Sequence, residues 1–248
     1  MTMDRLRMQM GPVRLEISKV KLFFLGTALL LLAGCAAPLY EVVPDYSAVR
    51  PTRIAVLPII NETSDQDAPI VFRILARAEL ADKGYALIDF NRIDEALRQR
   101  GIQEGGQIES LTCQEIGELV GADGLLYVRV MNYGRQVGVH IKMEGSFTMV
   151  DSRTCRKLWY SELSVADDIV LEGGMVALGA DLIGGKDARN KAVKTYLAAR
   201  QARTARAVAK FRSHPLRREV FRVITIDMEK IPLLDEFFSK NFRTLPRT

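Results

Sequence analysis

The sequence has few of the residues from which most catalytic and metal sites are built. Its 248 residues include three cysteines, two histidines and one tryptophan. Three cysteines exclude a small fold held by a disulfide framework, and two histidines leave little material for a zinc site or a histidine-based triad. The hydrophobic share of 48% and the charged share of 26% are typical of a globular protein, which excludes a disordered or multi-span membrane chain.

The longest apolar run is too short to cross a membrane. Residues 22–33 are apolar or small and follow Lys19 and Lys21. Twelve residues cover about 18 Å as a helix, whereas the hydrocarbon core of a bilayer is about 30 Å thick. A basic flank, a short apolar run and small residues at its end are typical of an export signal. We therefore predict that residues 1–34 are a signal peptide.

Residues 32–35, Leu-Ala-Gly-Cys, resemble the lipobox of bacterial lipoproteins. The resemblance implies cleavage between Gly34 and Cys35, followed by acylation of the Cys35 sulfur and amine. Two or more acyl chains anchor a protein stably, whereas one chain gives only marginal binding. Ala36 stands where an aspartate would retain an enteric lipoprotein at the inner membrane, so the resemblance implies an outer-membrane anchor. The expected domain then lies in the periplasm, with exposure at the cell surface left open.

Charge is distributed unevenly over the rest of the chain. Residues 35–185 contain 14 basic and 22 acidic residues, whereas residues 186–248 contain 16 basic and 6 acidic residues. Such a basic C-terminal segment could meet an acidic partner, lipid headgroups or the acidic part of its own chain. Nucleic acid is not an expected partner, because an exported and anchored protein would not encounter it.

Hydrophobic periodicity predicts an α/β (α+β mixed) fold, with a βαβ start that leads into an antiparallel meander. The result is a mixed sheet flanked by helices and followed by a long C-terminal helix. The first predicted elements are a strand at 52–60, a helix that Asp67 caps and that ends at Gly84, a strand at 85–90, and a helix that Asn91 caps and that ends at Gly101. A helix at 112–120 follows, with Thr112 and Glu115 as a capping box. The later elements are extended runs at 124–133, 136–150 and 155–166, with a turn at 151–154.

The remaining segments give weaker patterns. Residues 35–50 contain two prolines and are predicted to be a tether, and the glycine-rich residues 170–185 are predicted to be loop-like. Later elements are a long helix at 186–212, an edge strand at 219–226 and a short helix at 233–242. The predicted domains are the signal peptide 1–34, the tether 35–50, an α/β domain 51–212 and a basic C-terminal extension 213–248.

No constellation of residues indicates catalysis, a cofactor or a metal. Residues 180–187 depart from a phosphate-binding loop at both Ala180 and Asp187. His140 is expected on the surface of a strand, and His214 at a helix end, where a positive ring favours the carbonyl dipole. The acidic pairs Asp65–Asp67 and Asp167–Asp168 are expected to be solvated loop residues. We therefore predict that the protein is not an enzyme.

Two cysteines remain in the predicted domain, Cys113 and Cys155. After export they would meet an oxidising compartment, where a disulfide can form. The sequence does not give the distance between them. A disulfide and two unpaired structural cysteines are therefore equally compatible with it.

Three stretches resemble a known group of envelope proteins. They are residues 53–58 (RIAVLP) followed by Asn61, residues 121–128 (GADGLLYV), and residues 150–154 (VDSRT) followed by Leu158 and Trp159. In this order they resemble the first strand and loop, the entry to the next strand and the hairpin of proteins with a TolB amino-terminal-like or CsgG-like fold. The resemblance is strongest to a family of proteobacterial lipoproteins. The resemblance implies an α/β domain without known catalysis that serves in envelope assembly, transport or secretion.

Two features depart from that family. Cys155 replaces the expected turn glycine, and the basic tail after Phe211 has no counterpart. The resemblance makes Asp151 and Thr154 turn-forming residues and Trp159 a core residue, so these are markers of the fold and not of a site.

The expected function is that of a non-catalytic protein-interaction accessory in the envelope. Loops carry function more often than scaffold elements do. The exposed candidates for partner binding are therefore the loop 61–67, the glycine-rich segment 170–185 and the basic tail. The candidate interaction residues in the loop are Asn61, Glu62, Asp65 and Asp67. Two alternatives remain. One is a CsgG-like oligomeric secretion subunit, which needs amphipathic strands of about 9–11 residues. The other is a hydrolase that uses Asp65 and Asp67.

Overall fold

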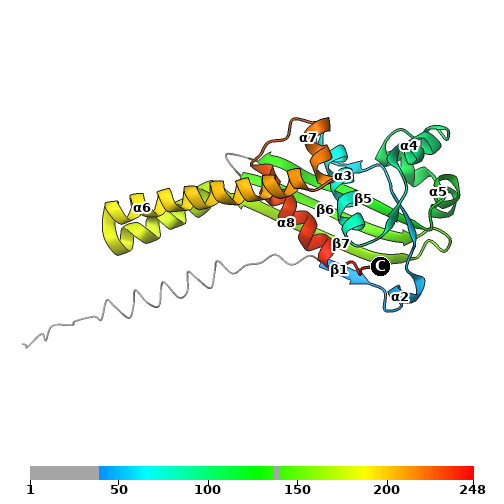
Figure 1. Ribbon diagram of the computed structural model, residues 1–248, viewed down its shortest axis with the longest axis horizontal. Coiled ribbons are helices and arrows are strands. Elements are labelled where there is room, and N and C mark those ends of the chain that lie inside the picture. Colours follow the sequence, from blue (N-terminus) through cyan, green and yellow to red (C-terminus); the bar gives the residue numbers. More distant parts are fainter. Residues whose placement is uncertain (1–38, 137–139) are drawn as a thin grey trace, which may run out of the picture. The chain divides into compact units, whose positions relative to one another are not determined.

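The computed structural model describes residues 39–136 and 140–248, which build one mixed sheet with helices on both faces (Figure 1). The strand order is β1-β7-β6-β5-β2-β4, and β3 (Ile60–Asn61) pairs with β5. This confirms the predicted α/β fold class. The predictions for the signal peptide, Gly34 and Cys35 concern residues outside the described part of the chain.

The parallel part of the sheet contains β2 (Arg53–Val56), which lies between β4 (Ala86–Leu87) and β5 (Gly124–Gln136). Helix α3 (Ala68–Asp82) connects β2 to β4, and α4 (Phe90–Arg98) and α5 (Cys113–Val120) lie between β4 and β5. Alternate side chains of β2 enter two apolar clusters. Ile54 and Val56 pack in the cluster that contains α3, whereas Ala55 and Leu57 pack with α4 and α5. The predicted βαβ start is confirmed, and its helices cover opposite faces.

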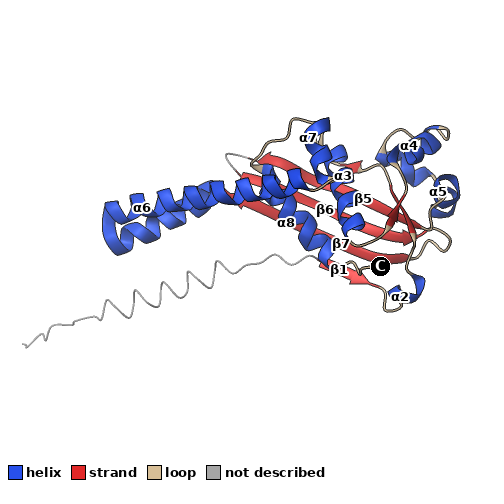
Figure 2. Ribbon diagram, in the orientation of Figure 1, coloured by secondary structure: helices blue, strands red, loops and turns tan. Residues whose placement is uncertain are grey.

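The antiparallel part is formed by β5, β6 (His140–Asp151), β7 (Lys157–Asp168) and the edge strand β1 (Leu39–Val42). Alternate residues of β6, from Ile141 to Met149, are fully buried, as period-two alternation predicts. Helix α8 (Lys230–Arg243) packs across these strands (Figure 2). The rings of Phe238 and Phe242 lie 5.5 and 4.9 Å from the ring of Phe147. Aromatic burial between α8 and β6 therefore forms the centre of the core.

The residues identified as fold markers have structural roles. Asp151 Oδ1 accepts hydrogen bonds from the Arg153 and Thr154 backbone, and Trp159 is fully buried. Asp123 accepts hydrogen bonds from the backbone of Thr52 and Arg53 at 3.0 and 2.6 Å. Burial by itself would raise the pKa of Asp123, but the hydrogen bonds outweigh it and lower that pKa. The Asp123 carboxylate therefore joins the start of β2 to the start of β5 by hydrogen bonds.

Cys113 and Cys155 form a disulfide between the start of α5 and the β6–β7 turn, with their Cα atoms 5.6 Å apart. Cys155 has a φ of 57°, in the left-handed region that favours glycine. It occupies the turn position at which the family resemblance expects a glycine. The disulfide therefore keeps a cysteine at a position whose backbone conformation favours glycine.

Two predictions for the N-terminal half were wrong in detail. The expected tether contains β1 and α2 (Tyr46–Val49), because its two prolines flank the strand and leave β1 free to pair with β7. The expected strand 52–60 is split, since Pro58 lacks an N–H group and separates β2 from β3.

The predicted helix caps are each displaced by two residues. Asp65, not Asp67, accepts hydrogen bonds from the backbone at the start of α3, at 2.9 and 3.2 Å. Asp89, not Asn91, caps α4. The Thr112–Glu115 capping box of α5 is confirmed.

The glycine-rich segment is helical, which corrects the predicted loop. Helix α6 (Ile169–Ser213) bends at Gly185, where φ is 71°, into a first arm of residues 169–184 and a second arm of residues 186–213. The arms pair: the Tyr196 hydroxyl donates to Glu172 at 2.9 Å, and a Cβ on Gly173 would lie 3.5 Å from the Tyr196 ring. Packing against the second arm thus overrides the low helix propensity of glycine.

The C-terminal residues belong to the same core, so they are more than an appended extension. The expected edge strand 219–226 is instead the short helices η2 (Arg217–Glu219) and α7 (Val220–Val223), and Val220 packs into the core. The tail also meets acidic residues of its own chain: Arg217 donates to Glu79 at 2.6 Å, and Lys230 donates to Asp65 at 3.1 Å.

Among the helices of residues 39–136 and 140–248, none combines the length and apolar character needed to cross a membrane.

Candidate functional site

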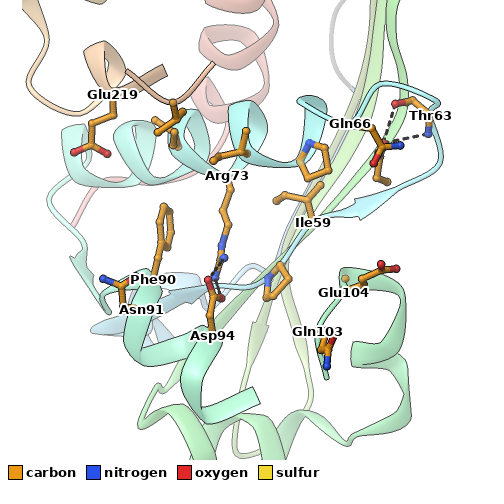
Figure 3. Close-up of a pocket in the computed structure, with 17 residues that line it drawn as sticks. Ile59, Thr63, Gln66, Arg73, Phe90, Asn91, Asp94, Gln103, Glu104 and Glu219 are labelled. Atoms are coloured by element: carbon orange, nitrogen blue, oxygen red, sulfur yellow. Dashed lines mark hydrogen bonds and ion pairs between the residues drawn. The ribbon is translucent and has the colours of Figure 1, made fainter. Parts of the chain in front are cut away.

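A groove of about 790 Å³ opens beside the carboxyl end of β2 (Figure 3). The chain leaves β2 toward α3 on one face of the sheet, and leaves the neighbouring parallel strand β4 toward α4 on the other. Ligands of open α/β sheets bind outside the carboxyl ends of the parallel strands. The groove lies outside the carboxyl end of β2 and therefore on the side of the sheet where such ligands bind.

The groove has an apolar base and a polar rim. Ile59, Ile74 and Phe90 contribute apolar surface. The polar lining comes from the loop after β2, the start of α4, the segment before η1 (Gly105–Ser110) and η2. These polar residues are Asn61, Thr63, Gln66, Asn91, Gln103, Glu104 and Glu219.

Arg73 of α3 lines the groove and contacts β2 and α4. Its Nε donates to the Val56 carbonyl at 3.1 Å, and its two terminal nitrogens donate to the Asp94 carboxylate at 2.8 and 2.6 Å. The guanidinium also lies 4.4 Å from the centre of the Phe90 ring. A bidentate pair stacked on an aromatic face is a strong, geometrically specific contact. Arg73 thus joins α3, β2 and α4, and its charge is already neutralised.

The loop predicted to mediate interaction forms one rim of the groove, and Asn61 is the member of the four candidate residues that lines it. Asn61 Nδ2 donates to the Asp65 carbonyl at 3.0 Å, and its Oδ1 accepts from the Thr63 backbone at 3.1 Å. The Asn61 side chain therefore stabilises the loop conformation through hydrogen bonds to the loop backbone.

The other three candidates lie away from the groove. Glu62 pairs with Arg129 of β5 and thereby raises the pKa of Arg129. Asp65 caps α3 and binds Lys230, and Asp67 is exposed without a capping hydrogen bond. The structure does not bring the four side chains together into one site.

The carboxylates and histidines considered for catalysis have structural partners. Asp167 is buried, contrary to expectation, and pairs with Arg200 at 2.7 Å and Arg203 at 3.3 Å. His214 Nε2 lies 2.9 Å from Asp82, and its Nδ1 accepts from two backbone N–H groups of the turn after α6. The side chains of His140 and Asp168 lie outside what the structure describes. In the described part of the chain, no three His, Cys, Asp or Glu residues converge as metal ligands.

The most important groove residues, Arg73 and Asp94, were not identified from the sequence. An arginine between Phe72 and Ile74 in an amphipathic helix was the only available signal. Its partner lies 21 residues away, and only the fold brings α3 and α4 to the same end of β2.

A family model described as "Putative lipoprotein GNA1162-like" matches residues 43–183. The chain belongs to this GNA1162-like family. The matched residues include most of the groove and the first arm of α6 nearly to its end. The predicted membership of a lipoprotein family is confirmed, whereas the TolB-like or CsgG-like fold label stays a prediction.

The chain is similar to a curated protein and to a crystal structure from Neisseria meningitidis. The curated protein "Putative lipoprotein NMB1124/NMB1162" of serogroup B is 24% identical over 148 residues, which is 56% of this chain and 67% of that protein. The crystal structure of lipoprotein GNA1162 has a TM-score of 0.44 and 23% identity, and covers 55% of this chain and 100% of its own. A PelC dodecamer from Paraburkholderia phytofirmans gives a TM-score of 0.36 and 16% identity, and covers 53% of this chain and 81% of its own.

Proposed function

We propose that this member of the GNA1162-like family is an outer-membrane lipoprotein, anchored through acyl chains on Cys35, whose domain is a non-catalytic accessory that binds another envelope protein. Family membership and the lipobox support the anchor. The accessory role covers envelope assembly, transport or secretion.

The groove beside β2 carries the binding part of the proposal. Its volume lies in the range of about 300–1,000 Å³ that is typical of ligand pockets. The lining residues include neither histidine, cysteine nor lysine, and the Arg73–Asp94 pair is internally satisfied. The lining therefore lacks the side chains of a histidine-based triad or a cysteine nucleophile, and its polar groups suit recognition.

The chemistry of the lining favours a polypeptide segment as the ligand. The amides of Gln66, Asn91 and Gln103 can both donate and accept hydrogen bonds, which matches the alternation of N–H and C=O groups along a backbone. Glu104 and Glu219 add negative charge at the rim, which suits a segment that carries lysine or arginine.

No specific observation favours either of the two alternative functions, the secretion subunit or the hydrolase. The strands long enough for a secretion subunit are β5, β6 and β7, of 13, 12 and 12 residues, and they form the central sheet beneath α8. The hydrolase would need Asp65, whose oxygens are engaged by the α3 backbone and Lys230.

Site-directed photocrosslinking in intact cells tests the proposal. A photoreactive residue at position 66 or 91 should capture one envelope protein, whereas the same residue at the exposed position 118 on α5 should not. Cys35→Ala should abolish palmitate labelling and reduce the groove crosslink. Equal products from all three positions, or unchanged labelling of Cys35→Ala, would contradict the proposal.

A further inference from the structure

The first arm of α6 carries an apolar stripe that the described residues, 39–136 and 140–248, leave exposed. Met175, Leu178 and Leu182 are spaced by three and four residues, so they share one face of the helix. Their exposed fractions are 48%, 63% and 72%, and the adjacent Ile183 at the bend is 64% exposed. Three consecutive members of one helical face are thus open to solvent, unlike scattered surface apolar residues, which need no explanation.

The opposite face of the first arm already has its partner. Glu172 and Gly173 contact Tyr196 of the second arm, and further along the hairpin Asp167 at the end of β7 binds Arg200. The arms therefore pair through one face, and Figure 1 shows that they project together beyond the sheet. The stripe is the face that this pairing does not cover.

The second arm is strongly basic. Residues 186–213 contain nine basic residues and one acidic residue. Lys186, Lys191 and Lys194 are exposed, and no carboxylate of residues 39–136 or 140–248 pairs with them. An exposed apolar face beside lysine and arginine is typical of helices that lie in the interface of an anionic bilayer.

The edge strand β1 adds two exposed apolar side chains. Strand β1 runs antiparallel to β7, and its first residue, Leu39, lies opposite Glu162, six residues before the end of β7 at Asp168. Leu39 and Tyr40 are 69% and 57% exposed. They belong to the sheet and not to the stripe on α6.

We propose that the α6 stripe and the basic second arm bind the surface of an anionic lipid bilayer, as a second contact beside the acyl anchor. That this contact is a second one rests on the proposed acylation of Cys35, whereas the amphipathic pattern and the charge stand on α6 alone. A second copy of the chain is a poorer occupant, because two strongly positive arms would repel each other.

Vesicle flotation tests this contact without the acyl chains. The chain is produced from residue 35 with Cys35→Ser, since the first described element, β1, begins at Leu39. The probes are vesicles of phosphatidylethanolamine and phosphatidylglycerol (3:1) and vesicles of phosphatidylcholine alone. We expect binding to the anionic vesicles that weakens as salt is raised.

Leu182→Glu is the test variant, and Met228→Glu is the matched control at an exposed apolar residue outside α6. Leu182→Glu should lower the partition coefficient on anionic vesicles about tenfold, whereas Met228→Glu should leave it within about twofold, with both variants keeping the parent melting temperature.

Three results would overturn the proposal: no preference of the parent for anionic vesicles, equal binding of Leu182→Glu, or a dimer in buffer that Leu182→Glu abolishes without any vesicle binding. Because this protein has no acyl chains, such results leave the anchor at Cys35 untouched. Palmitate labelling of the acylated protein tests that anchor separately.

Discussion

Helix α8 and the first arm of α6 carry apolar residues at helical spacing, yet they end in opposite environments. Phe237, Phe238 and Phe242 of α8 are buried against β6 and α3. Leu178 and Leu182 of α6 are mostly exposed. An amphipathic pattern therefore identifies an apolar face that is buried when a partner is available. The sheet buries this face of α8, and we propose that a bilayer buries this face of α6.

The two helices also differ in the size of their side chains. The α8 face consists of large rings that fill the space above the sheet, whereas the first arm of α6 includes Gly173, Gly174, Gly179 and Gly184. Aromatic burial contributes most where many neighbours are already in place. We therefore expect substitutions in the two regions to differ by several kcal/mol in their effect on the free energy of unfolding.

The largest effect is expected at the centre of the core. Phe237→Ala removes a ring that lies 5.5 Å from Phe72 and 5.8 Å from Phe147. Loss of its contacts and the resulting cavity should lower the free energy of unfolding by about 4 kcal/mol. Urea denaturation measures this loss. A loss below about 1 kcal/mol would contradict the expected difference in stability effects between α8 and α6.

The next effect concerns the ion pair that fastens the C-terminal turn to α3. Arg217→Met leaves Glu79 buried without its 2.6 Å partner, and should cost about 3 kcal/mol at pH 7. Burial already raises the pKa of Glu79 against the opposing effect of Arg217, and the variant should raise it further.

A raised folded-state pKa contributes stability that is present below the unfolded pKa of about 4.3 and is lost as pH rises through the folded value. The deficit of Arg217→Met should therefore shrink from pH 7 toward pH 5 in thermal melts. Adding Glu79→Gln should remove that pH dependence, and a deficit that stays constant would show that Glu79 is not its source.

Loss of the disulfide should have a smaller effect. Reduction, or Cys113→Ser with Cys155→Ser, frees a loop with a sequence separation of 42 residues and should cost about 2 kcal/mol. Hydrogen exchange should increase in α5 and the β6–β7 turn while the α6 arms remain unchanged. Faster exchange in α6 would mean that the arm and the sheet unfold together.

The smallest effect is expected in α6 itself. Leu182→Ala should change the free energy of unfolding by less than about 0.5 kcal/mol, because the side chain is largely exposed. Leu158→Ala, at a buried position of β7, is the control and should cost about 3 kcal/mol in the same urea titration. Similar losses for both would show that the stripe is covered within the chain.

Local patterns determined much of this protein. The alternation in β6, the Thr112–Glu115 capping box, the turn at Asp151 and the order of βαβ and meander depend on neighbours within a few residues, so they could be predicted from the sequence. The lipobox at Cys35 is equally local, and it remains a prediction.

Only the tertiary structure decided the rest, because the deciding partners are distant in sequence. Arg73 meets Asp94 across 21 residues, and Cys113 meets Cys155 across 42. The glycine-rich segment becomes a helix because the second arm packs against it, and residues 39–42 become a strand because β7 offers an edge. Short-range propensity sets what a segment can form, whereas the free energy of long-range packing selects which of those structures is formed.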